Sequence, residues 1–441
     1  MAAVAPGART RRPGVKRVRA ATTVAFLACT LSIGPGCAAR APALMPEDDS
    51  PATPALALGP AVPDPEVEGV LRAAGALIAA DGRPLPLTAW LPAGSPTTPD
   101  EAPGETPGVP VDEREAGNAD SAADTPAPEQ AGPSAAIVAL HGFNDYSAAF
   151  AAAARDWAAD GVAVYAYDQR GFGANPNPGR WPGVDALVAD ARAAMAALAA
   201  RHPDTPRYAL GESMGGAILL AALGEAPAAA AGSDGAVARR EAAGSPAIDG
   251  AVLVAPAVWA RETMPAVQRA ALWLADRLVP GLVLSGEGLG IEPTDNPETL
   301  RALWEDPLVI KRNRVDALAG VVDAMDRGLA AADDVATPLL VLYGDQEEVI
   351  PDPAVDALEA RLDPGRHTVG RYPEGYHMLL RDLNGPTVRA DIRAWLDDPD
   401  APLPSGADAA WHGAPSSSEA SPMASGEAPS AAEAEGVGTA R

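Results

Sequence analysis

The chain has 441 residues, with 59 acidic against 33 basic side chains and a formal net charge of −26. This balance excludes nucleic-acid binding as the main function, because that function depends on basic patches. The length exceeds the needs of one compact domain, and 46 prolines and 43 glycines indicate that part of the chain lies outside a packed core.

Residues 1–37 have the pattern of an export signal: basic residues precede an apolar run that is too short to span a bilayer comfortably. The two cysteines of the sequence, Cys29 and Cys37, both lie in this segment. The residues around Cys37 resemble a bacterial lipoprotein cleavage site, although Gly34 stands where such sites usually carry Leu. We expect an exported protein, either a lipoprotein anchored to a membrane through Cys37 or a periplasmic or secreted protein cleaved near Ala39.

Low-complexity composition divides the rest of the chain. Segments rich in Pro, Ala, Gly, Ser or acidic residues predict a disordered spacer, two insertions and a tail at 38–63, 94–134, 228–248 and 402–441. One globular domain is therefore predicted over 64–401. Much of the excess acid lies in the first insertion, so the net charge reflects solvated segments as much as a field that acts on a substrate.

Strand and helix patterns alternate through the predicted domain. An Asp81-Gly82 turn predicts an antiparallel hairpin, and buried helix faces are predicted around Leu187 and Ile392. The predicted strands cover residues 77–78, 85–91, 137–140, 162–167, 208–210, 251–254, 339–343 and 367–372. Such alternation predicts an α/β fold with a mostly parallel central sheet and helices on both faces.

The alternation is interrupted after the sixth predicted strand. Residues 258–334 show helical patterns and no strand, and we expect them to form a helical cap over the active site. The segment is rich in large apolar residues, including Trp259, Trp273 and Trp304. Most of these side chains are expected to pack the cap against the core, while the others could receive an acyl chain.

The clearest chemical signal is Gly-Glu-Ser-Met-Gly-Gly at 211–216, which matches the G-x-S-x-G nucleophile elbow of α/β-hydrolases. A strand pattern precedes it and a helix pattern follows it. Such a turn raises the Ser213 hydroxyl out of the sheet to a place where a base can reach it. Ser213 is therefore the predicted nucleophile.

A second apolar strand pattern ends in His141-Gly142-Phe143-Asn144. A hydrolase of this kind needs two backbone N–H groups directed at the developing oxyanion, one after the nucleophile and one from the loop that follows an earlier strand. Met214 and Phe143 are the candidates. His141 opens this loop and is expected to organise it rather than to act as the base.

The acid and the base should follow the nucleophile in the chain. Of the five histidines, only His377 lies on a loop between the last predicted strand and the final helix, so it is the predicted base. The acid should lie in the loop after the strand over 339–343, at the carboxyl edge of the sheet. Asp345, Glu347 and Glu348 compete for that role.

Four motifs together resemble the monoacylglycerol lipase and lysophospholipase branch of the α/β-hydrolases, which is also described as serine aminopeptidase-like. They lie at 141–143, 167–173, 211–216 and 375–379, within a likeness that runs from about Leu77 to Leu396. In that family the acid loop usually reads Gly-x-x-Asp-x-Val-x-Pro. Laid on Gly344 and Pro351, its Asp position falls on Glu347. The resemblance thus favours Glu347 as the acid. Asp345 stays the alternative, because the family pattern has Asp where this chain has Glu347.

The resemblance implies a Ser213-His377-acid triad, with the Phe143 and Met214 amides as the oxyanion hole. It implies hydrolysis of carboxylic esters such as monoacylglycerols or lysophospholipids. No metal or organic cofactor is expected, since no His, Cys or carboxylate cluster has ligand spacing. The expected partner is a small ester or lipid substrate, and a membrane surface would be reached through the N-terminal anchor.

Two other functions stay open on the sequence. A peptidase that releases N-terminal residues would need a carboxylate in the cap to hold the substrate amine, and Glu262, Asp276 or Glu287 could supply it. A surface binding module on a decayed hydrolase scaffold is the second alternative, and the change of the family's Asp to Glu347 is its only support.

Overall fold

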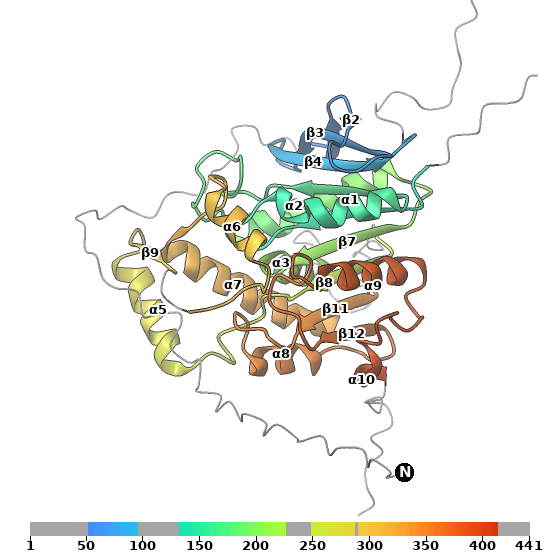
Figure 1. Ribbon diagram of the computed structural model, residues 1–441. Coiled ribbons are helices and arrows are strands. Elements are labelled where there is room, and N and C mark those ends of the chain that lie inside the picture. Colours follow the sequence, from blue (N-terminus) through green and yellow to red (C-terminus); the bar gives the residue numbers. More distant parts are fainter. Residues whose placement is uncertain (1–51, 96–131, 226–247, 287–289, 413–441) are drawn as a thin grey trace, which may run out of the picture.

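The computed structural model describes residues 52–95, 132–225, 248–286 and 290–412. The predicted signal segment, Cys37, most of the first insertion, nearly all of the second and most of the tail lie outside the described residues. The described parts form a central twisted sheet with helices packed on it (Figure 1).

The main sheet has the strand order β1-β3-β4-β6-β5-β7-β8-β11-β12, with β2 paired to β3. Its strands are Ala55–Leu58 (β1), Val62–Pro63 (β2), Val70–Ile78 (β3), Pro84–Pro92 (β4), Ala135–Leu140 (β5), Val162–Tyr167 (β6), Arg207–Glu212 (β7), Gly250–Val254 (β8), Leu339–Gly344 (β11) and His367–Tyr372 (β12). Strands β5 to β8, β11 and β12 pair in parallel, and β1 to β4 extend the sheet in antiparallel fashion as far as β6. The mostly parallel sheet predicted from the sequence is confirmed.

Helices cover both faces of the sheet. Helices α1 (Ala151–Ala159) and α9 (Gly385–Asp397) share one apolar core with it. Helices α2 (Val184–Arg201), α3 (Met214–Gly224), α7 (Val315–Ala331) and α8 (Asp352–Glu359) share the other. Strands β5, β6 and β11 are buried along their whole length because both faces of the sheet are covered, which explains their continuous apolar sequences.

Both ends of the domain extend beyond the predicted limits. The spacer predicted over 38–63 contains β1 and β2, which pair with β3. The predicted tail begins with the buried Leu403 and with helix α10 (Ala409–His412), and the indole N–H of Trp411 donates to the carbonyl of His367 at 2.7 Å. The prediction was wrong here because a short element at the edge of the domain can be held by one or two buried apolar side chains, such as Leu56 or Leu403, within a segment of low-complexity composition.

The cap is smaller than predicted and is not purely helical. It contains α5 (Ala266–Leu278), α6 (Pro297–Glu305) and the antiparallel pair β9 (Val283–Ser285) and β10 (Arg312–Arg314). Figure 1 shows α5, β9 and α6 on one side of the molecule. Helix α7 was predicted as part of the cap, but it packs against α3 in the core. Its buried glycines allow this close approach, since a Cβ on Gly328 would lie 2.6 Å from the carbonyl oxygen of Ala217.

The cap also buries fewer of its apolar residues than expected. Trp259, Met264 and Leu272 are buried as predicted. Trp273 and Trp304, however, are 58% and 61% exposed. In the described part of the chain, no helix is long and apolar enough to cross a membrane.

Candidate active site

Ser213 lies at the sharp turn between β7 and α3. Its backbone has φ 53° and ψ −114°, a conformation that is strained for a residue with a Cβ. The carbonyl of Ser213 accepts hydrogen bonds from the N–H groups of Gly216 and Ala257, both at 2.9 Å, and these contacts hold the turn. Ser213 is partly exposed, whereas its neighbours on both sides are buried. The predicted elbow therefore presents its hydroxyl at the carboxyl edge of the sheet.

The glycines of the elbow are required by close backbone contacts. A Cβ on Gly211 would lie 2.6 Å from the backbone of Gly215, and one on Gly215 would lie 2.0 Å from the carbonyl oxygen of Leu140. Helix α3 can pass so close to strands β7 and β5 only because neither position carries a side chain.

Ser213, His377 and Glu347 form one chain of hydrogen bonds. The His377 Nε2 lies 3.0 Å from the Ser213 Oγ, and its Nδ1 lies 2.7 Å from the Glu347 Oε2. Because a carboxylate only accepts, the Nδ1 carries the proton and the Nε2 of the neutral ring is free to accept from Ser213. Glu347 follows β11 and His377 follows β12, so neighbouring parallel strands bring them together.

Glu347, not Asp345, is the acid that contacts the histidine. The Glu347 Oε1 also accepts from the N–H groups of Val349 at 2.6 Å and Ile350 at 3.1 Å, and these bonds fix the carboxylate from behind. Asp345 is exposed, and the Glu348 carboxylate accepts from the Glu292 N–H at 2.9 Å. Of the three acids predicted for this loop, the structure brings only Glu347 to His377.

The environment of His377 favours its protonated form. Burial lowers the pKa of this imidazole, but the charge and hydrogen bond of Glu347, with the charge of Glu212, outweigh burial and raise the pKa above its usual value. The side chains of His377 and Glu347 are only 9% and 4% exposed. The pair is therefore suited to hold the positive charge that an imidazole acquires when it takes a proton from serine.

The loop of residues 141–144 lies against the nucleophile. A Cβ on Gly142 would lie 3.2 Å from the Cβ of Ser213. Within the described residues, the Phe143 and Met214 amides donate to no turn, loop or side-chain acceptor, so they are free to meet a substrate oxygen. The Phe143 ring packs edge-on against Phe172, with the ring centroids 5.6 Å apart, which fixes the loop from the side.

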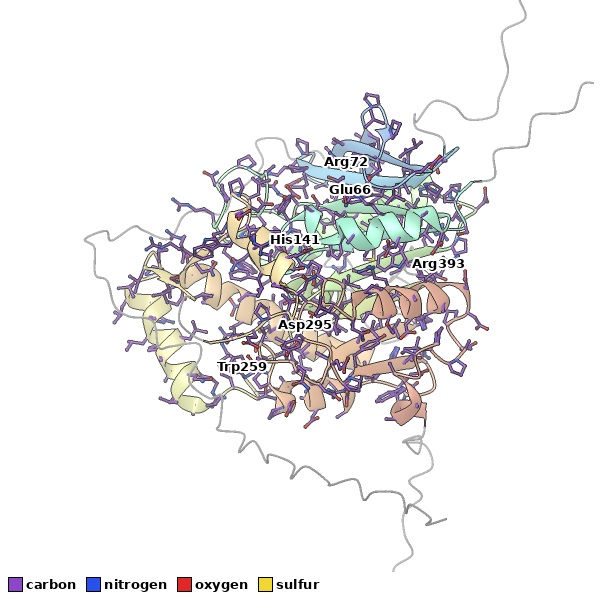
Figure 2. The ribbon with its side chains drawn as sticks, viewed as in Figure 1. Glu66, Arg72, His141, Trp259, Asp295 and Arg393 are labelled. Atoms are coloured by element: carbon purple, nitrogen blue, oxygen red, sulfur yellow. The ribbon has the colours of Figure 1, made fainter. Side chains whose placement is uncertain are left out.

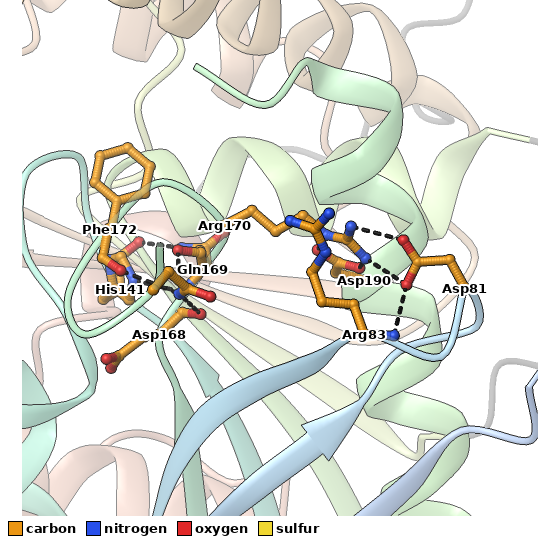
Figure 3. A network of polar contacts seen from close by, with 9 residues as sticks. Asp81, Arg83, His141, Asp168, Gln169, Arg170, Phe172 and Asp190 are labelled. Atoms are coloured by element: carbon orange, nitrogen blue, oxygen red, sulfur yellow. Dashed lines mark hydrogen bonds and ion pairs between the residues drawn. The ribbon is translucent and has the colours of Figure 1, made fainter. Parts of the chain in front are cut away.

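His141 holds this loop and lies outside the hydrogen-bond chain of Ser213, His377 and Glu347. Figure 3 shows it beside Gln169, whose side-chain amide donates to the His141 carbonyl at 2.7 Å. The His141 Nε2 accepts from the Gln169 N–H at 2.9 Å, and its Nδ1 lies 2.8 Å from the Gly142 carbonyl. Burial lowers the pKa of His141, which keeps the ring neutral. The structure thus gives His141 the organising role that the sequence predicted.

A buried ion network beneath the triad escaped sequence reasoning. The Arg381 guanidinium donates to the Asp145 carboxylate at 2.7 Å and to both oxygens of Glu212 at 3.2 Å. Asp145 follows the loop at 141–144, Glu212 precedes the nucleophile, and Arg381 follows His377. One cation therefore ties the three segments that carry the site. One feature of the sequence could have indicated this network: Glu212 is a charged residue at the end of a buried strand, where it needs a partner of opposite charge.

The cap is hydrogen-bonded to these same segments. The Ile310 N–H donates to the Asn144 carbonyl at 2.9 Å, and the Met378 N–H donates to the Pro293 carbonyl at 2.9 Å. Asp295, labelled in Figure 2, accepts from the Leu383 N–H at 2.8 Å. Contacts with the cap therefore help to position both the 141–144 loop and the loop that carries His377.

We expect Glu212→Gln to move the acidic limb of the pH profile of kcat/KM to lower pH. A histidine that serves as the base must be neutral, and the negative charge of Glu212 helps to raise the pKa of His377. Removing the charge leaves Arg381 less compensated, which lowers the His377 pKa further. The measurement is kcat/KM of an ester substrate between about pH 5 and 9.

The matched control is Glu68→Gln, because Glu68 is exposed on the turn before β3. Its acidic limb should coincide with that of the unmodified protein. An acidic limb of Glu212→Gln that stays in place or rises would contradict the role assigned to the Glu212 charge.

Two further histidines and the Glu262 carboxylate lie outside the hydrogen-bond chain of Ser213, His377 and Glu347. Burial lowers the pKa of His202 and of His367 to about 4 each, so both rings stay neutral. The carboxylate of Glu262, a candidate for amine binding, pairs with Arg361 at 2.8 Å, and Glu287 lies outside the described residues. No group of three or more His, Cys, Asp or Glu among the described residues could hold a metal ion.

Two known proteins are similar to this chain in sequence or in fold. The monoacylglycerol lipase of Mycolicibacterium smegmatis is 28% identical over 270 residues, which cover 60% of this chain and 88% of the lipase. A soluble variant of the monoglyceride lipase of Saccharomyces cerevisiae, solved with a substrate analogue, matches with a TM-score of 0.51 and 15% identity over 80% of this chain and 98% of its own. The second likeness concerns the fold alone.

The family model described as serine aminopeptidase, S33, matches residues 131–384, which is more than half of the chain. The match includes Ser213, Glu347 and His377, the residues that the structure brings together. The chain therefore belongs to the serine aminopeptidase S33 family of α/β-hydrolases.

Proposed function

We propose that the protein cleaves carboxylic esters of lipid-like alcohols, such as monoacylglycerols or lysophospholipids, with Ser213, His377 and Glu347 as its catalytic triad. The protein is a serine ester hydrolase. The observation that supports the triad most directly is the hydrogen-bond chain from the Ser213 Oγ through the His377 ring to the Glu347 carboxylate, with contacts of 3.0 and 2.7 Å.

The reaction follows from this arrangement. The Ser213 Oγ attacks the ester carbonyl carbon while the His377 Nε2 takes the hydroxyl proton. The Phe143 and Met214 N–H groups donate to the oxyanion of the tetrahedral intermediate. His377 then gives its proton to the leaving alcohol oxygen, and an acyl-enzyme remains. Water attacks that ester with His377 as the base, and the carboxylic acid leaves as Ser213 regains its proton.

The preference for lipid-like esters is supported by the surface of the cap. Its exposed large apolar side chains are Val267, Trp273, Leu274, Leu278, Val279, Val283, Leu300, Trp304 and Leu308. An apolar concentration of this kind on a soluble domain indicates contact with an apolar ligand or surface. The relative from M. smegmatis carries the name monoacylglycerol lipase, which agrees with a lipid ester.

The test is a series of p-nitrophenyl esters from acetyl to palmitoyl, with aminoacyl-naphthylamides measured in parallel. Because each buried CH₂ contributes about 0.8 kcal/mol, we expect kcat/KM to rise by roughly ten-fold or more from acetyl to octanoyl. The naphthylamides should not be turned over. Turnover of the naphthylamides alone would make the protein a peptidase, and no turnover of either class by the folded protein would favour the binding module.

The peptidase remains the second candidate because the family description names a serine aminopeptidase. A peptidase would need a carboxylate in the cap to hold the substrate amine, and Glu262 is a poor candidate because it is already paired with Arg361. For the location of the protein, we propose export on the basis of residues 1–37, with Cys37 as the site of a lipid anchor or with cleavage near Ala39 to a periplasmic or secreted form.

A further inference from the structure

A cavity lies apart from Ser213, His377 and Glu347. Its volume is about 220 Å³, and it lies between the β3–β4 turn and the long loop that joins β6 to α2. Its walls come from Arg83, Arg170, Asn175, Asn177, Arg180 and Trp181, with adjoining residues of the same loop. Ser213, His377 and Glu347 do not line it. The cavity is therefore not the place where the proposed ester bond would be cleaved.

The charge of this cavity is opposite to that of the chain. Three arginines line it and no carboxylate does, although the chain has a net charge of −26. Arg170 is neutralised from outside the lining, by Asp81 at 2.7 Å and Asp190 at 2.5 Å. Figure 3 shows Arg83 beside this cluster. Within the described residues, the guanidinium groups of Arg83 and Arg180 form no ion pair of their own. The three arginines of the lining set against the two carboxylates of Asp81 and Asp190 leave the cavity with a net charge of +1.

Trp181 supplies an apolar part of the wall that is fixed in position. The Trp181 indole packs so closely on α7 that a Cβ on Gly320 would lie 2.2 Å from its Nε1. The Asn175 side chain donates to the carbonyls of Asp168, Gln169 and Phe172 at 2.8, 3.1 and 3.0 Å, which ties the loop together. The Arg170 ion pairs attach the same loop to α2 and to the β3–β4 turn. These contacts form the cavity in the absence of any ligand.

We propose that this cavity binds a small organic anion. Its phosphate or carboxylate group would lie between the guanidinium groups of Arg83 and Arg180, and its apolar body would lie against Trp181. Guanidinium groups suit both kinds of anion because their planar N–H donors match the oxygens of either. The cavity is smaller than the roughly 300–1,000 Å³ of pockets for drug-sized ligands, so it suits a compact molecule rather than a long acyl chain.

The test is isothermal titration calorimetry on the full chain carrying Ser213→Ala, so that no ester chemistry contributes. The probes are phenyl phosphate, benzoate, inorganic phosphate and benzyl alcohol. We expect one phenyl phosphate to bind per chain, and Arg83→Gln and Arg180→Gln each to weaken binding by about ten-fold, the usual effect of losing one charge-assisted hydrogen bond. Arg72→Gln is the matched control. Arg72 is exposed on β3 (Figure 2), and its replacement removes the same charge as the cavity variants do.

The probes also identify the anion and the role of Trp181. Binding of phenyl phosphate without benzoate would assign the cavity to phosphate esters, and equal binding of both would assign it to organic anions in general. Trp181→Leu should weaken phenyl phosphate more than inorganic phosphate. Three results would overturn the proposal. They are benzyl alcohol binding as tightly as the anions, no binding of either organic anion, and equal affinity of phenyl phosphate for the two cavity arginine variants and for Arg72→Gln when all melting temperatures are unchanged. None of these outcomes depends on which ester the triad cleaves.

Discussion

Replacing Ser213 with Ala is expected to lower kcat for p-nitrophenyl esters by about a million-fold, the size of loss seen when a triad serine is removed from another serine hydrolase. The Ser213 Oγ is the only hydroxyl at the His377 Nε2, at 3.0 Å in the described structure. Without it no acyl-enzyme can form. The residual rate should reflect water attack assisted by the oxyanion donors alone.

Two comparisons make this result specific. Ser134→Ala removes an exposed hydroxyl at the start of β5 and should leave kcat unchanged. The double variant Ser213→Ala/His377→Ala should be no slower than either single variant, because the triad acts as a unit. A fluorophosphonate probe should label the unmodified protein and not Ser213→Ala. Ester hydrolysis that survives in Ser213→Ala at a comparable rate would remove Ser213 from the mechanism.

Glu347→Gln is expected to lower kcat by roughly 10⁴-fold, by analogy with the amide substitution of a triad acid. The two backbone bonds from Val349 and Ile350 hold one oxygen of the side chain, so Gln would keep its oxygen there and turn its NH₂ toward His377. A donor at that place forces the proton onto the Nε2. That nitrogen would then donate to the Ser213 Oγ instead of accepting from it, and the base would be lost.

Asp345→Asn is the matched control for this prediction, because Asp345 lies two residues earlier in the same loop and is exposed. Its kcat should stay within about two-fold of the unmodified value, as for most surface changes. Both variants should melt at similar temperatures. A large loss in Asp345→Asn together with a small one in Glu347→Gln would assign the acid to Asp345, contrary to the hydrogen bonds in the structure.

Much of this fold was predictable because its signals are local. The strands over 162–167 and 367–372 have the predicted bounds, and the first of them is one continuous apolar run. The same is true of the elbow, where Gly211 and Gly215 leave no room for side chains. The choice of Glu347 over Asp345 came from the resemblance of residues 344–351 to the family's acid-loop pattern, and the structure brings Glu347 to within 2.7 Å of His377.

The features that escaped prediction depend on contacts between distant residues. Arg381 lies 169 residues from Glu212 and 236 from Asp145, so no local pattern joins them. Helix α7 has an apolar face that would serve a cap or a core equally well, and only its packing against α3 decides between them. Strands β1 and β2 are short, and their proline- and alanine-rich surroundings resemble those of a linker.

The hydrogen bonds that join the cap to the catalytic loops bear on how this enzyme could be modified or could have diverged. Because Ile310 holds the carbonyl of Asn144 and Pro293 holds the amide of Met378, the cap is part of the scaffold that orders the site. A chimera that exchanged the cap for another would therefore alter the placement of the 141–144 loop and of His377 together with the surface of the cap. Changes in substrate specificity would therefore be coupled to changes in rate. New specificities would arise most readily through substitutions within the cap rather than through replacement of the whole cap.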